Sequence, residues 1–184
     1  MKIKGLCLEI SLILLKLILI AMKQLEIKTL IKECKIDELE DLDRKLIETA
    51  KKATIRAYAP FSKYQVGAAL LLDNGKIVEG SNQENAAYPS GLCAERTAAF
   101  YASSANPGLA FKKIAIAAWI DPGKDKDWEE GFQKHPVSPC GGCRQALLEY
   151  EHLYGDIEVL LYGKEKTYIL PSIKSLLPLA FTDF

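Results

Sequence analysis

Three cysteines and one glutamate have the types and spacing to do chemistry together. Cys93 and Glu95 lie two positions apart, and Cys140 and Cys143 follow downstream in the segment Pro-Cys-Gly-Gly-Cys. Three thiolates can hold a zinc ion and leave its fourth position open for water. An acid that is not itself a ligand can then move protons to and from that water. The pattern predicts a three-cysteine catalytic zinc site, with Glu95 as the group that transfers protons.

Two other interpretations of the cysteines need weighing. Cys140 and Cys143 alone could form a redox pair, although that motif is typical of a thioredoxin-like βαβ context. A purely structural zinc site would want a fourth Cys or His ligand. His135 and His152 are available, but neither has the spacing of a ligand, and both are predicted to be surface residues.

Composition narrows the class of partner. The chain has 184 residues, 24 basic and 24 acidic, so its formal net charge is zero. It is long enough for one domain with a proper core. No basic field is available for a polynucleotide, which favours a small-molecule substrate and no nucleic acid. The five cysteines are odd in number, and Cys7 and Cys34 have no partner motif. This argues against a disulfide framework and predicts a reducing, cytoplasmic location.

The N-terminal stretch differs from the rest of the chain. Leu6 to Met22 is nearly all apolar, interrupted by residues that include Glu9 and Lys16. It could be a spurious extension with the true start at Met22, a peripheral helix, or a membrane or export segment. We expect residues 1–21 to lie outside the fold, residues 22–184 to form the domain, and no membrane association.

Hydrophobic periodicity predicts the elements that would position the site. Predicted helices cover 37–59, 93–103, 143–151 and 172–177, and predicted strands cover 64–73, 77–81, 113–120, 157–161 and 167–170. The charged face of the first helix is expected to be solvated, and 121–135 is expected to be an exposed polar insertion. The last two strands are joined too closely for a parallel crossover and should be antiparallel. The predicted fold class is α/β, a three-layer α/β/α sandwich with a mixed five-stranded sheet.

Helix starts are favourable places for the cysteines. Cys93 opens one predicted helix, and Cys140 with Cys143 opens another. Free backbone N–H groups and the helix dipole stabilise a thiolate at such a position.

Several motifs occur together and in a family-like order. They are Ala59-Pro60-Phe61-Ser62-Lys63-Tyr64-Gln65-Val66-Gly67-Ala68-Ala69-Leu70, Asn82-Gln83-Glu84-Asn85-Ala86-Ala87-Tyr88-Pro89, Cys93-Ala94-Glu95-Arg96-Thr97-Ala98, Ser138-Pro139-Cys140-Gly141-Gly142-Cys143-Arg144-Gln145 and Leu176-Leu177-Pro178-Leu179-Ala180-Phe181. With these residues the chain resembles the cytidine deaminases of the small, homotetrameric, three-cysteine zinc class.

The resemblance implies an activity and a set of roles. The activity is zinc-dependent hydrolytic deamination of cytidine and 2′-deoxycytidine to the uridine forms plus ammonia, in pyrimidine salvage. Cys93, Cys140 and Cys143 would bind Zn²⁺. Glu95 would carry protons from water to ring N3 and to the departing ammonia, and Arg96 would temper the thiolate charge.

The resemblance also implies how the substrate would be held. Asn82 and Glu84 would hydrogen-bond the ribose at its 3′-hydroxyl, and Tyr64 would pack against the base. Neighbouring subunits would contribute further residues to the same pocket, namely Ala86, Tyr88 and Phe181. The site would then need the homotetramer. Capping of the loop is the alternative role for Asn82 and Glu84.

Two departures from the family pattern and two alternative functions remain. Phe61 and Tyr64 stand as if exchanged, and the segment 121–135 lengthens the chain between the cysteine motifs. A related zinc aminohydrolase could act on another cytosine nucleoside, such as an antibiotic of the blasticidin type. A catalytically silent zinc-binding module is the other alternative, and the presence of Glu95 counts against it.

Overall fold

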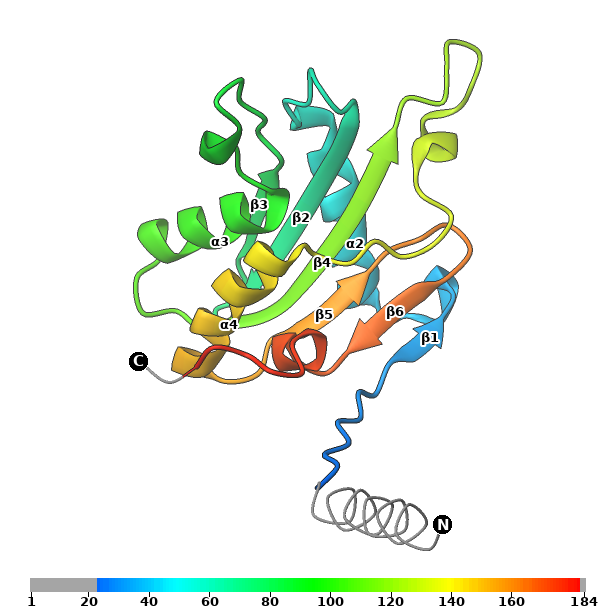
Figure 1. The fold of residues 1–184 in the computed structure, drawn as a ribbon. Helices are drawn as coiled ribbons and strands as arrows, with labels where there is room; N and C mark the ends of the chain where they lie inside the picture. Colours follow the sequence, from blue (N-terminus) through cyan, green and yellow to red (C-terminus); the bar gives the residue numbers. More distant parts are fainter. Residues whose placement is uncertain (1–22, 183–184) are drawn as a thin grey trace, which may run out of the picture.

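A mixed six-stranded sheet forms the centre of the fold, as the computed structural model, which describes residues 23–182, shows (Figure 1). The extension predicted for residues 1–21 lies outside the described residues. The strands are β1 (Lys32–Cys34), β2 (Tyr64–Leu72), β3 (Ile77–Ser81), β4 (Phe111–Ile120), β5 (Glu158–Leu161) and β6 (Thr167–Leu170). The α-helices are α2 (Asp41–Ala53), α3 (Ala94–Ala105) and α4 (Gly141–Tyr154). The 3₁₀ turns are η1 (Ile36–Glu38), η2 (Thr54–Arg56), η3 (Tyr88–Ser90), η4 (Trp128–Gly131) and η5 (Ile173–Leu176).

The strand order is β1-β6-β5-β4-β2-β3, and β4 and β5 form the parallel pair among otherwise antiparallel neighbours. The structure confirms the α/β fold class and the antiparallel hairpin of the last two strands, in which Leu160 lies opposite Ile169. The predicted number of five strands is wrong by one. The sixth strand, β1, pairs with β6 and places Lys32 opposite Ile169.

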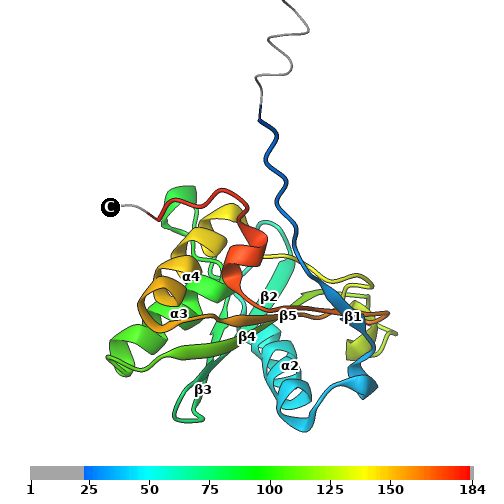
Figure 2. The ribbon, with the colours of Figure 1, turned by 90° about the horizontal axis from the view of Figure 1, so that it is seen from below.

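The sheet is covered on both faces. Helix α2 lies against one face, and α3 and α4 lie against the other (Figure 2). Along β2, Ala68 and Leu70 pack toward α3 and α4, while Ala69 and Leu71 pack toward α2. This alternation explains why the central strands are apolar at consecutive positions.

A glycine brings α3 close to the sheet. A Cβ atom at Gly80 of β3 would overlap the carbonyl oxygen of Ala94 and the backbone nitrogen of Ala98. Only glycine allows this close packing of strand and helix. The contact fixes the first turn of α3, which carries Cys93 at its N-cap and Glu95 inside it.

The first predicted helix is shorter than expected. Residues 37–59 divide into η1, the α-helix α2 and the 3₁₀ turn η2, which ends at Arg56. Among residues 23–182, no helix combines the length and apolarity needed to cross a bilayer.

One basic side chain of α2 departs from the predicted solvated face. Lys51 is 4 % exposed. Its ammonium group is surrounded by the rings of Trp128, Phe132 and Tyr162, at 5.7, 5.1 and 5.2 Å from their centres. Cation–π attraction of this kind strengthens when the cation is removed from water.

Two carboxylates complete the surroundings of Lys51. Its Nζ lies 2.8 Å from Glu48 and 3.0 Å from Glu129. Burial alone would lower the pKa of Lys51, but these ion pairs outweigh that effect and raise it. Because Glu129 and the Trp128 ring belong to the segment 121–135, Lys51 fastens this segment to α2. Most of this segment is exposed as expected, but the expectation is wrong for Gly131 and Phe132, which are buried.

We expect Lys51→Ala to lower the free energy of unfolding by about 2 to 3 kcal/mol, because it removes a buried cation from three rings and two ion pairs. Lys51→Met keeps the apolar stem among the rings and should cost less than half as much. Urea denaturation of the two variants and the parent measures this. The assignment fails if Lys51→Ala stays within about 0.5 kcal/mol of the parent, the scatter of ordinary surface changes.

Candidate active site

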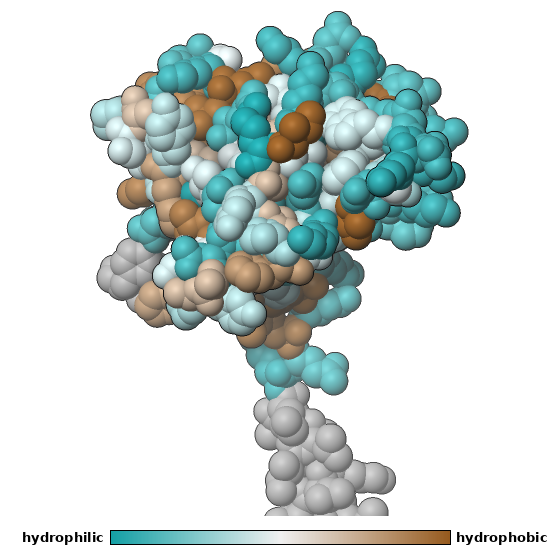
Figure 3. Space-filling view, turned by 90° about the horizontal axis from the view of Figure 1, so that it is seen from above, coloured by the Kyte–Doolittle hydropathy of each residue, from teal (hydrophilic) through white to brown (hydrophobic). Residues whose placement is uncertain are grey.

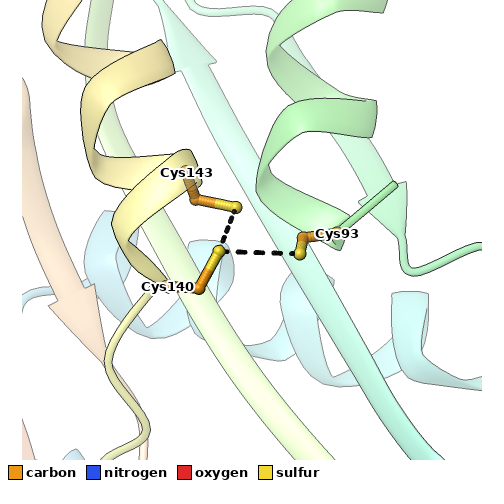
Figure 4. Close-up of side chains that lie close together, drawn as sticks. All are labelled: Cys93, Cys140 and Cys143. Atoms are coloured by element: carbon orange, nitrogen blue, oxygen red, sulfur yellow. Dashed lines mark hydrogen bonds between the residues drawn. The ribbon is translucent and has the colours of Figure 1, made fainter. Parts of the chain in front are cut away.

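Three sulfur atoms converge where two helices begin. Cys93 is the N-cap of α3, Cys140 is the N-cap of α4, and Cys143 lies in the first turn of α4 (Figure 4). The Sγ atoms of Cys93 and Cys140 are 3.8 Å apart, and those of Cys140 and Cys143 are 3.4 Å apart. Tetrahedral zinc with Zn–S bonds of about 2.3 Å places its sulfur ligands about 3.8 Å apart. The three cysteines therefore fit Zn²⁺, and they confirm the predicted ligand set.

The charge of the site is balanced by its surroundings. Arg96, in the first turn of α3, directs Nη2 at the sulfur of Cys93 from 3.9 Å. Hydrogen bonding from the Cys143 thiol, and then from Arg96, lowers the pKa of Cys93 to about 5 against the opposing effect of burial. The same hydrogen bond, together with burial, raises the pKa of Cys143. Zinc binds cysteine as the thiolate, so zinc binding releases the protons that these thiols carry.

Glu95 is a buried acid beside the sulfur cluster. It is the second residue of α3 and is 4 % exposed. Burial raises the pKa of its carboxyl group, and the charge of Cys93 adds to the rise. The metal-binding cluster consists of the three sulfurs and does not include this carboxylate. A buried acid with a raised pKa next to a metal site, but not a ligand, can act as general acid and base.

A pocket of about 590 Å³ opens beside Cys93 and Arg96. Its lining comes from the turn before β2, the loop between β3 and α3, and the first turn of α3: Phe61, Ser62, Asn82, Gln83, Glu84, Asn85, Tyr88, Gly91, Leu92, Cys93 and Arg96. The volume is in the range of small-molecule sites. Figure 3, which looks onto the end of the molecule where β2 begins, shows hydrophobic patches set among hydrophilic residues.

Asn82 and Glu84 line this pocket and also brace its walls. Asn82 accepts a hydrogen bond from the Val66 amide at 2.7 Å and donates one to the Tyr64 carbonyl at 2.9 Å. The Glu84 carboxylate accepts the amide of Phe61 at 2.8 Å. These bonds show the capping role that the sequence left open. A carboxamide and a carboxylate each retain capacity for a further bond, so the bracing leaves room for a ligand hydroxyl.

The other predicted substrate residues are placed less uniformly. Tyr88 lines the pocket, and its ring packs edge-on to that of Phe61 with 6.1 Å between centres. Tyr64 begins β2, half-buried, and lies outside the pocket lining of a single chain. Ala86 is exposed in the loop before η3 and is also outside that lining. Phe181 lies beside α4, where its carbonyl accepts a hydrogen bond from Gln145 at 2.9 Å.

Sequence reasoning missed several lining residues. Phe61 entered only as half of an unusual pair, whereas in the structure Phe61 lines the pocket and Tyr64 does not. Ser62 was also missed, although the Ser62 amide donates to Glu84 at 3.3 Å. What identifies Phe61 and Ser62 as pocket residues is their contact with Glu84. That contact joins segments more than twenty residues apart, so the local sequence does not show it.

Comparison with known proteins agrees with this geometry. Residues 40–154, more than half of the chain, match the model of the cytidine and deoxycytidylate deaminase zinc-binding region. The cytidine deaminase of Sporosarcina psychrophila is 42 % identical over 138 residues, which span 75 % of this chain and 90 % of that protein. That of Halalkalibacterium halodurans is 39 % identical over 142 residues, 77 % and 96 % of the two chains.

Solved structures give the same result. The crystal structure of cytidine deaminase from Burkholderia pseudomallei superimposes with a TM-score of 0.60 at 40 % identity, covering 74 % of this chain and 97 % of that one. Cytidine deaminase from Mycobacterium tuberculosis superimposes with a TM-score of 0.57 at 30 % identity, covering 76 % and 96 %. With three sulfurs, a buried glutamate and a family match across its central elements, this chain belongs to the cytidine and deoxycytidylate deaminase family.

Proposed function

We propose that this protein is a zinc-dependent hydrolase that converts cytidine and 2′-deoxycytidine to uridine and 2′-deoxyuridine, with release of ammonia, in pyrimidine salvage. The observation that carries the proposal is the buried Glu95 beside three converging sulfurs, next to a pocket of nucleoside size. The names of the relatives, which are cytidine deaminases, support the choice of substrate.

Zinc held by Cys93, Cys140 and Cys143 supplies, when bound, the Lewis acidity that activates a water for attack on the amino-bearing carbon of cytosine. Glu95 takes a proton from that water and gives one to ring N3. It then takes the second proton, from the oxygen that has been added to that carbon, and gives it to the amino group, which leaves as ammonia as the carbonyl of uridine forms. Burial suits Glu95 to this task, because a raised pKa brings the carboxyl group closer to the pH at which it must exchange protons.

Asn82 and Glu84 hold the sugar through its 3′-hydroxyl. Because 2′-deoxycytidine has the same 3′-hydroxyl, both nucleosides are substrates. A nucleotide fits less well. The cation in the pocket lining is Arg96, which is engaged with Cys93, and the carboxylate of Glu84 would repel a phosphate.

The base lies among aromatic side chains. Phe61 lines the pocket, and Tyr64 packs from the start of β2, where its carbonyl already holds Asn82. Burial raises the pKa of the Tyr64 hydroxyl above its usual value.

The active form is a homotetramer whose sites are shared between subunits. Large apolar side chains are exposed in η3, in α3, in α4 and in the segment after η5: Tyr88, Phe100, Tyr101, Leu153, Leu179 and Phe181. Covering them with further copies of the chain removes apolar surface from water. In that assembly Ala86, Tyr88 and Phe181 of one subunit complete the pocket of another.

The catalytic domain comprises residues 22–184, and the apolar residues 1–21 are an extension outside it. Cysteines that act as metal ligands and not as disulfides are typical of a reducing compartment, which supports a cytoplasmic location. No membrane or nucleic-acid partner is part of the proposal.

The first experiment follows the ultraviolet band of cytosine in the presence of purified zinc-loaded protein. Cytidine, 2′-deoxycytidine, 2′-deoxycytidine monophosphate and a blasticidin-type nucleoside are compared, with ammonia measured in parallel. The proposal expects turnover of the first two, none after chelation, and recovery when zinc is restored. Preferred turnover of the nucleotide or the antibiotic, or no turnover with one zinc per chain, would overturn the substrate assignment.

A further inference from the structure

The C-terminal segment from Ile173 to Phe181 is held along α4 by side chains of that helix. Figures 1 and 2 show it running beside α4 after η5. Glu151, buried at the far end of α4, accepts the amides of Ile173 at 2.6 Å and Lys174 at 3.1 Å. Gln145 donates to the Phe181 carbonyl at 2.9 Å. The segment is thus attached at both ends.

Arg144 makes the attachment in the middle, and it also reaches the zinc site. Its Nη1 donates to the carbonyl of Leu176 at 2.9 Å. Its Nε donates to the carbonyl of Pro139 at 2.8 Å. Pro139 directly precedes Cys140, and Arg144 directly follows Cys143. One rigid guanidinium therefore fixes both the turn that carries two zinc ligands and the segment that carries Phe181.

The geometry points to Arg144 as a positioning residue: we propose that it couples zinc binding at Cys140 and Cys143 to the placement of the C-terminal segment. The part of this inference that concerns activity rests on the proposed function, because Phe181 acts there in the site of a neighbouring subunit. The zinc content of one chain then determines how well its Phe181 is placed in the site of the neighbouring subunit.

The coupling follows from the two carbonyls that Arg144 holds. Zinc fixes Cys140 and Cys143, and so it also fixes the carbonyl of the adjacent Pro139. The Arg144 guanidinium bridges this carbonyl and that of Leu176. Without zinc the turn gains freedom, so the two hydrogen bonds of Arg144 hold the carbonyls of Pro139 and Leu176 less firmly. Linkage is reciprocal, so a segment held in place must also favour zinc binding by the same factor.

The test measures zinc affinity and hydrogen exchange in zinc-loaded and chelated protein, under reductant, for the parent and Arg144→Gln. The amides of Ile173, Lys174 and Leu177 report on the segment, since each donates a hydrogen bond. In the parent, zinc removal should speed their exchange several-fold. In Arg144→Gln the exchange should be fast with or without zinc, and zinc affinity should fall about tenfold, as for groups that orient ligands.

Gln145 provides the matched control on the same helix. Its side chain donates to the carbonyl of Phe181 and not to that of Pro139, so Gln145→Ala should loosen the end of the segment and leave zinc affinity within about twofold. Arg144→Lys, which offers one point donor in place of the fork, should restore only part of the coupling. Protection of the β2 and β4 amides shows that each variant is folded.

The inference is overturned if segment exchange in the parent is insensitive to zinc, or if Arg144→Gln binds zinc as tightly as the parent. Both measurements use no substrate, so they stand even if the proposed reaction fails. An added activity assay tests the neighbour part: Arg144→Gln, saturated with zinc, should raise KM more than it lowers kcat.

Discussion

Glu95→Gln is expected to lower kcat by about 10³- to 10⁴-fold, the upper part of the range for general acid–base catalysis, because the same carboxylate serves every proton transfer of the proposed reaction. The amide has nearly the same shape and can accept no proton. Zinc binding should persist, since the cluster of ligands does not include this side chain. Zinc content and single-turnover absorbance on the same preparation separate the two effects.

Glu95→Asp is the matched control for this variant. It keeps a carboxyl group but shortens the side chain by one methylene in a buried position, so some turnover should remain. A Glu95→Gln protein with full zinc that keeps a tenth or more of the parent kcat would contradict the proton-transfer role.

The metal site could be predicted from the sequence because its information is local. Cys93 stands at the start of one helix, and Cys140 with Cys143 at the start of another, so each motif carries its own geometry. The motifs do not show that the starts of α3 and α4 come together in the fold. That convergence depends on close packing such as the contact of Gly80 with α3.

Features that depend on pairing between distant segments were missed. Strand β1 has three residues without apolar alternation, and its partner β6 lies more than a hundred residues away. The burial of Lys51 was missed for the same reason. Helical periodicity places this lysine on a polar face, while the rings that cover it come from Trp128, Phe132 and Tyr162 far downstream.

The double role of Asn82 and Glu84 also lay beyond the sequence. Residue types at these positions suggested either ribose binding or loop capping as alternatives. The structure shows capping by hydrogen bonds to Val66 and Phe61. It also places both side chains in the pocket, so the two roles are compatible.

Phe181→Ala is expected to lower kcat/KM for cytidine by about 10- to 100-fold, because base–aromatic stacking is worth roughly 1 to 3 kcal/mol. Within one chain Phe181 lies beside α4, 66 % exposed and outside that chain's own pocket lining. If it acts in a neighbour's site, then Phe181→Ala and Glu95→Gln damage the two halves of a shared site.

Mixed oligomers test this sharing directly. When differently tagged Phe181→Ala and Glu95→Gln chains exchange subunits, about a quarter of the sites should combine an intact Glu95 with an intact neighbouring Phe181. Oligomers that carry both tags should then be several times more active than the average of the two unmixed variants. The matched control mixes Phe181→Ala with a chain that carries both substitutions. That chain has no Phe181 to donate, so no gain should appear. If the first mixture shows no gain, each chain completes its own site. An intact Glu95 on one chain and an intact Phe181 on another would then never lie in the same site.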